Sequence, residues 1–214
     1  VLVAPDGTIN DNGARFWNAT PACCGGDPEG RSVDDVAYIS DLIREAAQTY
    51  SVDATRVALF GHSNGGFMTL RMACEASDLV TAAISLAGST FDDPLDCQPA
   101  SEPVTMMILH GTEDETILYD GGTIGENAYP GAVAVSERSA AQAGCDVDNP
   151  VQGPDLDVDR AIPGAETTVL AYPDCGQGAE VELWTMVGGV HIPTDWNPAA
   201  QDAFIDWLIG HPRN

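Results

Sequence analysis

The sequence predicts an α/β domain in which a mostly parallel sheet is covered by helices on both faces. Short apolar runs that suit buried strands alternate with longer segments whose apolar residues recur at helical spacing. Such alternation is typical of βαβ units and therefore of parallel sheets. The 214 residues contain no internal repeat and no obvious linker, so we expect residues 1–214 to form one domain.

The first half of the chain supplies three strands and two helices. Apolar residues 1–4 stop at Pro5, which predicts a buried strand that enters a turn. Ser32 is a suitable N-cap for a helix that continues to about Ala47, because the apolar residues between them follow a helical period. Further along, the pattern predicts a strand at 56–60, a helix at 67–77 and a strand at 82–87.

The second half adds three strands and two helices. A buried strand is expected at 104–109, followed by an alanine-rich helix from about Tyr129 to Ala143. Residues 167–172 and 181–187 alternate like strands, and residues 198–209 form a closing amphipathic helix. No long apolar insertion precedes the 104–109 strand, so we expect an open cleft without a lid domain.

The charge of the chain excludes two classes of partner. Eight basic residues stand against 33 acidic ones, which gives a net charge of −25, and no lysine is present. Such a surface repels nucleic acid and anionic lipid. No apolar run reaches the length of a membrane span. We therefore expect neither nucleic acid nor membrane as a partner; the acidity itself suits either adaptation to salt or solubility outside the cell.

The six cysteines indicate disulfides and an oxidising compartment. They form no C-x-x-C pair and have no histidine at zinc-finger spacing, so we expect no metal site. Cys145 and Cys175 bracket one loop and strand and are the expected pair, with the others paired among themselves: Cys23, Cys24, Cys74 and Cys97. The protein is then expected to be secreted or periplasmic. The Asp155–Asp159 run lacks the glycine and terminal glutamate of a calcium-binding EF-hand loop, so no calcium is expected there.

A candidate nucleophile lies between the second strand and the helix after it. Residues 61–65 read Gly-His-Ser-Asn-Gly, the G-x-S-x-G pattern, at a strand-to-helix junction. A sharp turn there exposes the Ser63 hydroxyl near helix-terminal N–H groups that can hold an oxyanion. The backbone N–H of Asn64, the next residue, is the expected first donor.

A nucleophilic serine needs a general base and an acid that orients the base. Of four histidines, His191 is the expected base, because it lies in a glycine-rich loop just after the last strand. His110, inside a strand end, is expected to be packed and hydrogen-bonded, and His211 is expected to be solvated. Glu113, Asp114 and Glu115 follow the 104–109 strand, and Asp114 is preferred because a short side chain suits a buried bond to imidazole.

The order Ser63, Asp114, His191 is that of α/β-hydrolases, and stretches along nearly the whole chain resemble one branch of them. The chain resembles secreted bacterial polyhydroxybutyrate depolymerases and feruloyl esterases in the stretches 4–8, 15–20 with Cys23-Cys24, 33–36, 61–68, 110–114 and 182–191. The resemblance implies an α/β-hydrolase fold and the same three catalytic residues, and it raises Asp114 above the two glutamates. No cofactor is implied.

The resemblance also implies a gap. Members of this branch usually carry further strands and a His-Gly loop before the segment that matches residues 1–7, and the loop supplies a second oxyanion donor. Relative to them the chain is N-terminally shortened, as a fragment or processed product, or because another element fills the gap. In one alternative, strand 1–4 moves beside strand 56–60 and Gly7 or Thr8 becomes the donor; in the other, a second copy pairs there in a homodimer.

These features predict a serine carboxylic ester hydrolase that works through an acyl-enzyme on small or polymer-attached esters, including polyesters. The alternatives are a serine peptidase of the same fold and a weakly active remnant with an incomplete oxyanion hole. The candidates for lining the substrate pocket are apolar or aromatic residues near the site: Trp17, His62, Tyr119, Ile192 and Trp196.

Overall fold

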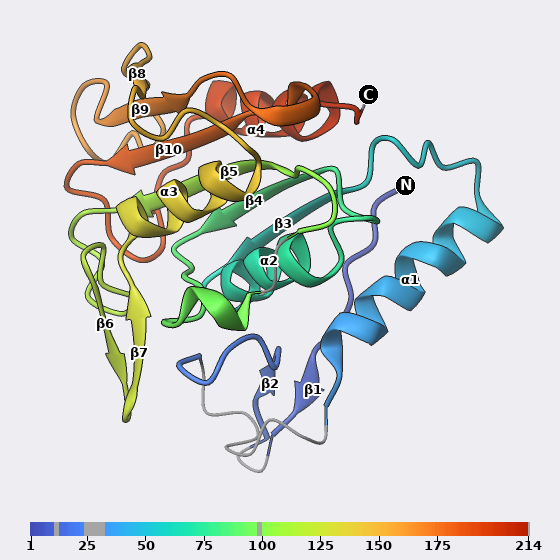
Figure 1. Ribbon diagram of the computed structural model, residues 1–214. Helices are drawn as coiled ribbons and strands as arrows, with labels where there is room; N and C mark the ends of the chain where they lie inside the picture. Colours follow the sequence, from blue (N-terminus) through green and yellow to red (C-terminus); the bar gives the residue numbers. More distant parts are fainter. Residues whose placement is uncertain (11–12, 24–32, 98–99, 214) are drawn as a thin grey trace.

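The computed structural model describes residues 1–10, 13–23, 33–97 and 100–213 (Figure 1). Its centre is a six-stranded sheet in the order β3-β4-β5-β10-β9-β8. The strands β3 (Ala58–His62), β4 (Ala82–Leu86), β5 (Thr105–Gly111) and β10 (Val181–Met186) are parallel to one another. At the edge of this sheet, β9 (Thr167–Tyr172) pairs in antiparallel fashion with both β10 and β8 (Val151–Gln152). The predicted mostly parallel sheet is confirmed.

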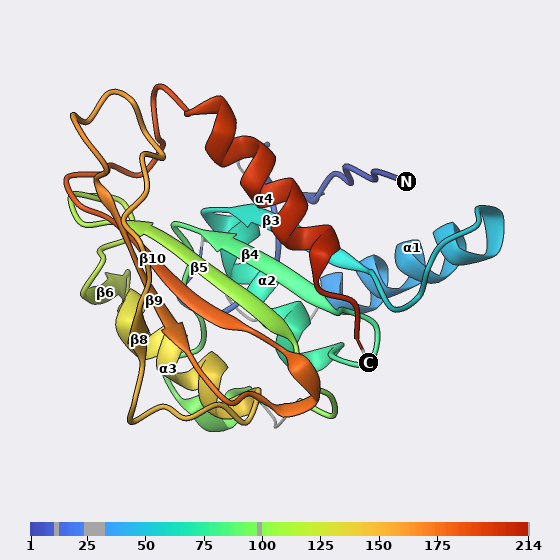
Figure 2. The ribbon, with the colours of Figure 1, turned by 90° about the horizontal axis from the view of Figure 1, so that it is seen from above.

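Helices cover both faces of the sheet, as predicted. Figure 2 shows α4 (Pro198–Gly210) on one side, with α2 (Asn64–Glu75) and α3 (Ala132–Gln142) on the other. The alternation of β5 explains the two cores, because side chains point to opposite faces in turn. Met106 and Ile108 join the core under α2 and α3, whereas Met107 and Leu109 join the core under α4.

The first helix, α1 (Asp35–Thr49), packs against α2. Its N-cap is Asp34, whose carboxylate accepts the backbone N–H of Ala37. The predicted cap, Ser32, lies outside the described residues. An aspartate immediately before the helix serves as the cap because its short carboxylate reaches the free N–H groups of the first turn.

The strand predicted at residues 1–4 is wrong. Val1 and Leu2 are 81% and 93% exposed, and residues 1–4 belong to no strand. Among the described residues β3 pairs only with β4, so the segment does not move beside β3. Four apolar residues make a strand only where a neighbouring strand accepts their backbone bonds, and here none does. The first strand is β1 (Thr8–Ile9), which pairs with β2 (Arg15–Phe16).

The helix predicted from about Tyr129 begins later, at Ala132. Tyr129 and Pro130 instead end β7 (Asn127–Pro130), which pairs with β6 (Gly121–Ile124) in a hairpin. The hairpin projects from the edge of the molecule below α3 in Figure 1. Gly121 and Gly125 adopt positive φ there, a conformation that glycine takes without strain.

Two disulfides are present among the described residues. Cys145 and Cys175 are bonded as predicted and join the end of α3 to the turn after β9. Cys74 and Cys97 link α2 to the segment before β5, which agrees with the expectation that the remaining cysteines pair among themselves. Cys23 is also disulfide-bonded, and Cys24 lies outside the described residues. No helix in the described part of the chain is long and apolar enough to span a membrane.

Candidate active site

Ser63 occupies a strained turn between β3 and α2. Its φ of 56° and ψ of −120° are rarely adopted by residues other than glycine, and such strain clusters at functional sites. Two backbone bonds hold the turn: the Ser63 N–H donates to the Leu86 carbonyl, and the Phe67 N–H donates to the Ser63 carbonyl. The serine therefore lies at the carboxyl end of the parallel strands, where α/β sheets place their ligand sites.

The two glycines of the G-x-S-x-G pattern have different surroundings. A Cβ added to Gly61 would lie 2.1 Å from the Gly65 carbonyl oxygen and 2.5 Å from the Thr69 hydroxyl, whereas one added to Gly65 meets nothing within 4 Å. We expect Gly61→Ala to lower the free energy of unfolding by about 3 kcal/mol, because the clash involves backbone. Gly65→Ala is expected to change it by less than about 1 kcal/mol. Urea unfolding of both variants tests this, and equal effects would contradict it.

A continuous chain of hydrogen bonds joins Ser63, His191 and Asp114. The Ser63 Oγ lies 3.0 Å from His191 Nε2, and His191 Nδ1 lies 2.8 Å from Asp114 Oδ2. Asp114 is buried and His191 is mostly buried. The structure thus brings together the three residues that the sequence grouped, although they come from the ends of three different strands.

The Asp114 carboxylate is held by four donors. Its Oδ1 accepts the backbone N–H groups of Thr116 and Ile117, and its Oδ2 lies 2.8 Å from His191 Nδ1 and 3.2 Å from His110 Nε2. Burial raises the pKa of Asp114, but the bonds from His110, His191 and the two amides outweigh burial and lower the pKa to about 2. The carboxylate is therefore ionised at neutral pH. Glu113 and Glu115, its neighbours, are exposed.

His110 is packed and hydrogen-bonded as expected, but its contact with Asp114 was not anticipated. Its ring is 1% exposed, Nε2 also reaches the Ile117 carbonyl at 2.8 Å, and Nδ1 has no partner among the residues that the structure describes. Two acceptors at Nε2 fix the proton on that nitrogen and leave Nδ1 as the bare lone pair. The one sequence signal for this contact was the spacing of His110 and Asp114, which lie four residues apart at the end of β5.

His62 lies against the candidate base. Its Nε2 is 2.8 Å from the His191 carbonyl oxygen, and the two rings are 4.7 Å apart. Since a carbonyl only accepts, His62 donates and carries its proton on Nε2. Burial lowers the pKa of His62 and outweighs the opposing effect of its hydrogen bond to the His191 carbonyl, which favours a neutral ring.

Asn64 ties a distant loop to the elbow. Its side-chain oxygen accepts the Trp17 N–H at 2.6 Å, and its side-chain nitrogen donates to the Trp17 carbonyl at 2.8 Å. Its own backbone N–H lies in the first turn of α2, where N–H groups have no intrahelical acceptor. Asn64 can thus anchor Trp17 through its side chain and offer its backbone N–H to a substrate.

The other predicted pocket residues differ in what they contact. Trp17 stacks on Tyr38 with ring centroids 6.3 Å apart. The Tyr119 hydroxyl is 2.7 Å from the Thr185 hydroxyl, and Trp196 packs edge-on against Phe204 in the core under α4. Ile192, directly after His191, is 60% exposed. A substrate-binding role for these residues stays a prediction.

A second oxyanion donor also stays a prediction. Gly7 and Thr8 were candidates if residues 1–4 paired beside β3, and that pairing is absent from the described residues. Instead Thr8 pairs with Phe16, and the Gly7 carbonyl accepts the Arg15 guanidinium at 2.9 Å. In the described part of the chain no hydrogen bond joins Gly7 or Thr8 to the elbow.

Comparisons with known proteins agree with this fold. The model of the prolyl oligopeptidase family matches residues 26–92. Feruloyl esterase B of Piromyces equi is 30% identical over 192 residues, which cover 85% of this chain and 32% of that protein. Feruloyl esterase D of Neurospora crassa is 25% identical over 181 residues, which cover 85% of this chain and 53% of that protein. The chain therefore spans between a third and about half of the length of these relatives.

Among solved structures, the acetyl xylan esterase from Aspergillus awamori matches with a TM-score of 0.56 at 17% identity, covering 81% of this chain and 66% of that one. The sheet order, the strained serine turn and this likeness identify the fold as that of the α/β-hydrolases. The sequence is similar to feruloyl esterases, which agrees with the resemblance noted from its motifs.

Proposed function

We propose that the protein is a serine carboxylic ester hydrolase with Ser63 as nucleophile, His191 as general base and Asp114 as the acid that orients the base. The observation that carries the proposal is the unbroken chain of bonds from Ser63 Oγ through the His191 ring to a buried, ionised Asp114. With His191 Nδ1–H donated to Asp114, Nε2 is left as the acceptor for the serine proton.

The reaction has two halves. The Ser63 Oγ attacks the ester carbonyl while His191 takes the serine proton. The Asn64 backbone N–H donates to the oxyanion of the tetrahedral intermediate. His191 then protonates the alkoxide of the leaving alcohol, and the acyl group stays on Ser63. Water, deprotonated by the same histidine, releases the acid and restores the serine. None of these steps uses a cofactor.

The proposed substrates are esters of small acids or aromatic acids, free or attached to a polymer. Relatives are described as feruloyl esterases, and a solved structure of the same fold as an acetyl xylan esterase. The exposed Ile192 beside His191 suits a site at the surface that a polymer chain can approach. Polyesters are included among these substrates, and the disulfides and the acidic composition support a secreted protein.

A serine peptidase is the second candidate, because the matching family model is that of the prolyl oligopeptidases and it covers the elbow. Amide hydrolysis uses the same three residues, so the geometry does not separate the two activities. A remnant with weak activity is a third candidate, since the loss of one oxyanion donor costs about 10²–10³ in turnover.

Covalent labelling tests the proposal. A fluorophosphonate is expected to add one phosphonyl group, located on Ser63 by mass spectrometry of peptides, and the protein is expected to hydrolyse p-nitrophenyl acetate much faster than peptide anilides. A folded protein that neither labels nor hydrolyses either substrate would overturn the assignment of an enzyme. Preferential cleavage of the anilides would favour the peptidase.

A further inference from the structure

The segment that carries His191 is anchored on both sides, and we call residues 187–197 the base loop. Before His191, the Gly188 N–H donates to the Thr112 hydroxyl at 2.8 Å, and the Gly189 carbonyl accepts the Glu113 N–H at 2.8 Å. These bonds tie the first part of the base loop to the loop that carries Asp114. They do not hold the chain after His191.

The chain after His191 is held from residues 158–160. The backbone N–H groups of Thr194 and Asp195 donate to the two oxygens of Asp159, both at 3.0 Å. The Asn197 N–H donates to the Val158 carbonyl, and the Asp195 carbonyl accepts the Arg160 N–H. Asp159 thus contacts the base loop three and four residues after the candidate base.

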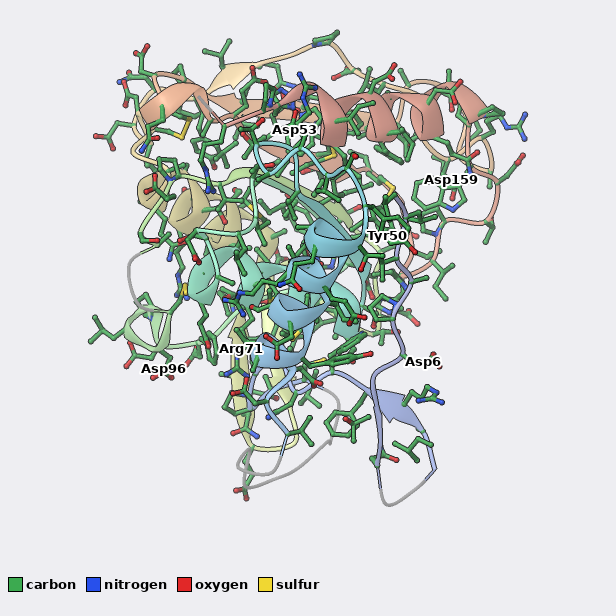
Figure 3. All side chains as sticks on the ribbon, turned by 90° about the vertical axis from the view of Figure 1, so that its right-hand side faces the viewer. Asp6, Tyr50, Asp53, Arg71, Asp96 and Asp159 are labelled. Carbon is green, nitrogen blue, oxygen red and sulfur yellow. A yellow bond between two sulfur atoms is a disulfide. The ribbon has the colours of Figure 1, made fainter. Side chains whose placement is uncertain are left out.

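Asp159 is a buried charge whose described partners are backbone amides. It is 2% exposed, and besides the two amides of the base loop it accepts the Ala161 N–H at 3.1 Å. In the view of Figure 3, Asp159 lies below α4, whereas Asp6 and Asp96 lie lower in the molecule. Burying a carboxylate is costly unless its oxygens are hydrogen-bonded, so its place here requires these three amides to stay in position.

A second buried carboxylate fixes the segment that carries Asp159. Glu166 is 7% exposed, and its Oε1 accepts the N–H groups of Val158 at 3.1 Å and Asp159 at 2.9 Å, and the Thr167 hydroxyl at 2.8 Å. Thr167 belongs to β9, in the central sheet. A chain of bonds therefore runs from the sheet through Glu166 and Asp159 to the base loop.

We propose that Asp159 is a positioning residue for His191: its carboxylate fixes the loop that presents the imidazole to Ser63 and Asp114. The inference rests on the proposed function of His191. Asp159 is the last residue of the acidic run 155–159, whose sequence faintly resembles a calcium-binding loop. In the structure the two carboxylate oxygens of Asp159 instead accept backbone N–H groups. Asp157, two residues earlier, is exposed and serves as a matched control.

Asparagine is the informative replacement for Asp159. It keeps the size of the side chain but supplies one acceptor oxygen, and its NH₂ group would face the N–H of Thr194 or Asp195. The base loop must then shift, and a shift of about 1 Å at a catalytic group can cost about 10²-fold in rate. The first part of the loop stays tied to residues 112 and 113, so the imidazole is expected to move rather than to leave the site.

The test compares Asp159→Asn with Asp157→Asn and the unaltered protein on p-nitrophenyl acetate. Active sites are counted by fluorophosphonate labelling at saturation, so that a lower folded fraction does not lower the rate per site. We expect Asp159→Asn to reduce kcat per labelled site by about 10- to 100-fold with KM little changed, and to move the acid limb of the pH profile of kcat. Asp157→Asn is expected to match the unaltered protein. An unchanged kcat per site and pH profile for Asp159→Asn would overturn the proposal.

Amide hydrogen exchange in the unaltered protein keeps the proposal testable if Asp159→Asn does not fold. The N–H groups of Thr194 and Asp195, two exposed residues, are expected to exchange slowly because a buried carboxylate accepts them. Exchange of both amides as fast as in an unstructured chain would overturn the proposal. An unaltered protein with slow exchange but no ester hydrolysis would instead refute the proposed function, which separates the two failures.

Discussion

Ser63→Ala is expected to lower kcat for ester hydrolysis by about 10⁶-fold, because the variant lacks the atom that forms the acyl-enzyme. The turn at residue 63 has positive φ, and alanine tolerates it no worse than serine does, so the fold should be retained. The remaining rate would come from binding and from the oxyanion donor acting on water. In serine hydrolases that have lost a triad member, the remaining rate is about 10³–10⁴ times that of the uncatalysed reaction.

A double variant of Ser63 and His191 tests whether the two residues act together. His191→Ala alone removes the base 3.0 Å from the Ser63 hydroxyl, and a serine without its base is a weak nucleophile. Ser63→Ala and His191→Ala together are therefore expected to be no slower than either alone. Single-turnover rates with p-nitrophenyl acetate and thermal unfolding of all three proteins provide the measurement. Losses that multiply in the double variant would show that the two residues act independently, contrary to the proposal.

The sequence predicted the parts of the fold that depend on local pattern. The strands around the elbow were expected within about two residues, because buried parallel strands are continuous apolar runs, and the helix after it begins three residues earlier than expected, at Asn64. The grouping of Ser63, Asp114 and His191 followed from their positions directly after strands, since parallel strands end at one edge of the sheet.

The parts that failed depend on neighbours. Residues 1–4 have the composition of a strand but no strand to pair with among the described residues. The helix expected from about Tyr129 begins only at Ala132, because Tyr129 and Pro130 end the β6–β7 hairpin, whose glycines at 121 and 125 have positive φ. The hydrogen bond from Thr194 to Asp159 joins residues 35 positions apart in the chain, and local sequence patterns do not reveal such contacts.

His110 shows the same limit inside the site. Its burial was expected from its place in a strand, yet its bond to Asp114 depends on how the chain turns after β5. That contact matters for the acid. Burial raises the pKa of this carboxylate, and the bonds from two histidines and two amides outweigh burial, so the carboxylate keeps its charge.

Asp114→Asn is expected to lower kcat by about 10⁴-fold while leaving the structure of the site intact. The side chain keeps its shape, so the amides of Thr116 and Ile117 can still donate to its oxygen. Its NH₂ group, however, would face the nitrogen of His191 that now donates to Oδ2. The imidazole would then carry its proton on Nε2, toward Ser63, where it can no longer accept the serine proton.

The matched control is Glu113→Gln, which removes the charge of an exposed residue next to Asp114 in the chain. We expect its kcat to equal that of the unaltered protein, because an exposed carboxylate interacts weakly with the site. Similar losses in both variants would mean that the net charge of the loop, rather than the bond to His191, supports catalysis. A small loss in Asp114→Asn alone would remove Asp114 from the proposed triad.

The free energy of unfolding at low pH gives an independent test of the lowered pKa of Asp114. The pKa of Asp114 is lowered to about 2 in the folded protein, from an ordinary value of 3.8. A lowered folded-state pKa contributes stability that is present above pH 4 and is lost as the pH falls toward 2. The difference corresponds to about 2 kcal/mol. Asp114→Asn lacks this contribution, so its unfolding free energy should fall less steeply between pH 4 and pH 2 than that of Glu113→Gln, and parallel curves would contradict the four-donor description of Asp114.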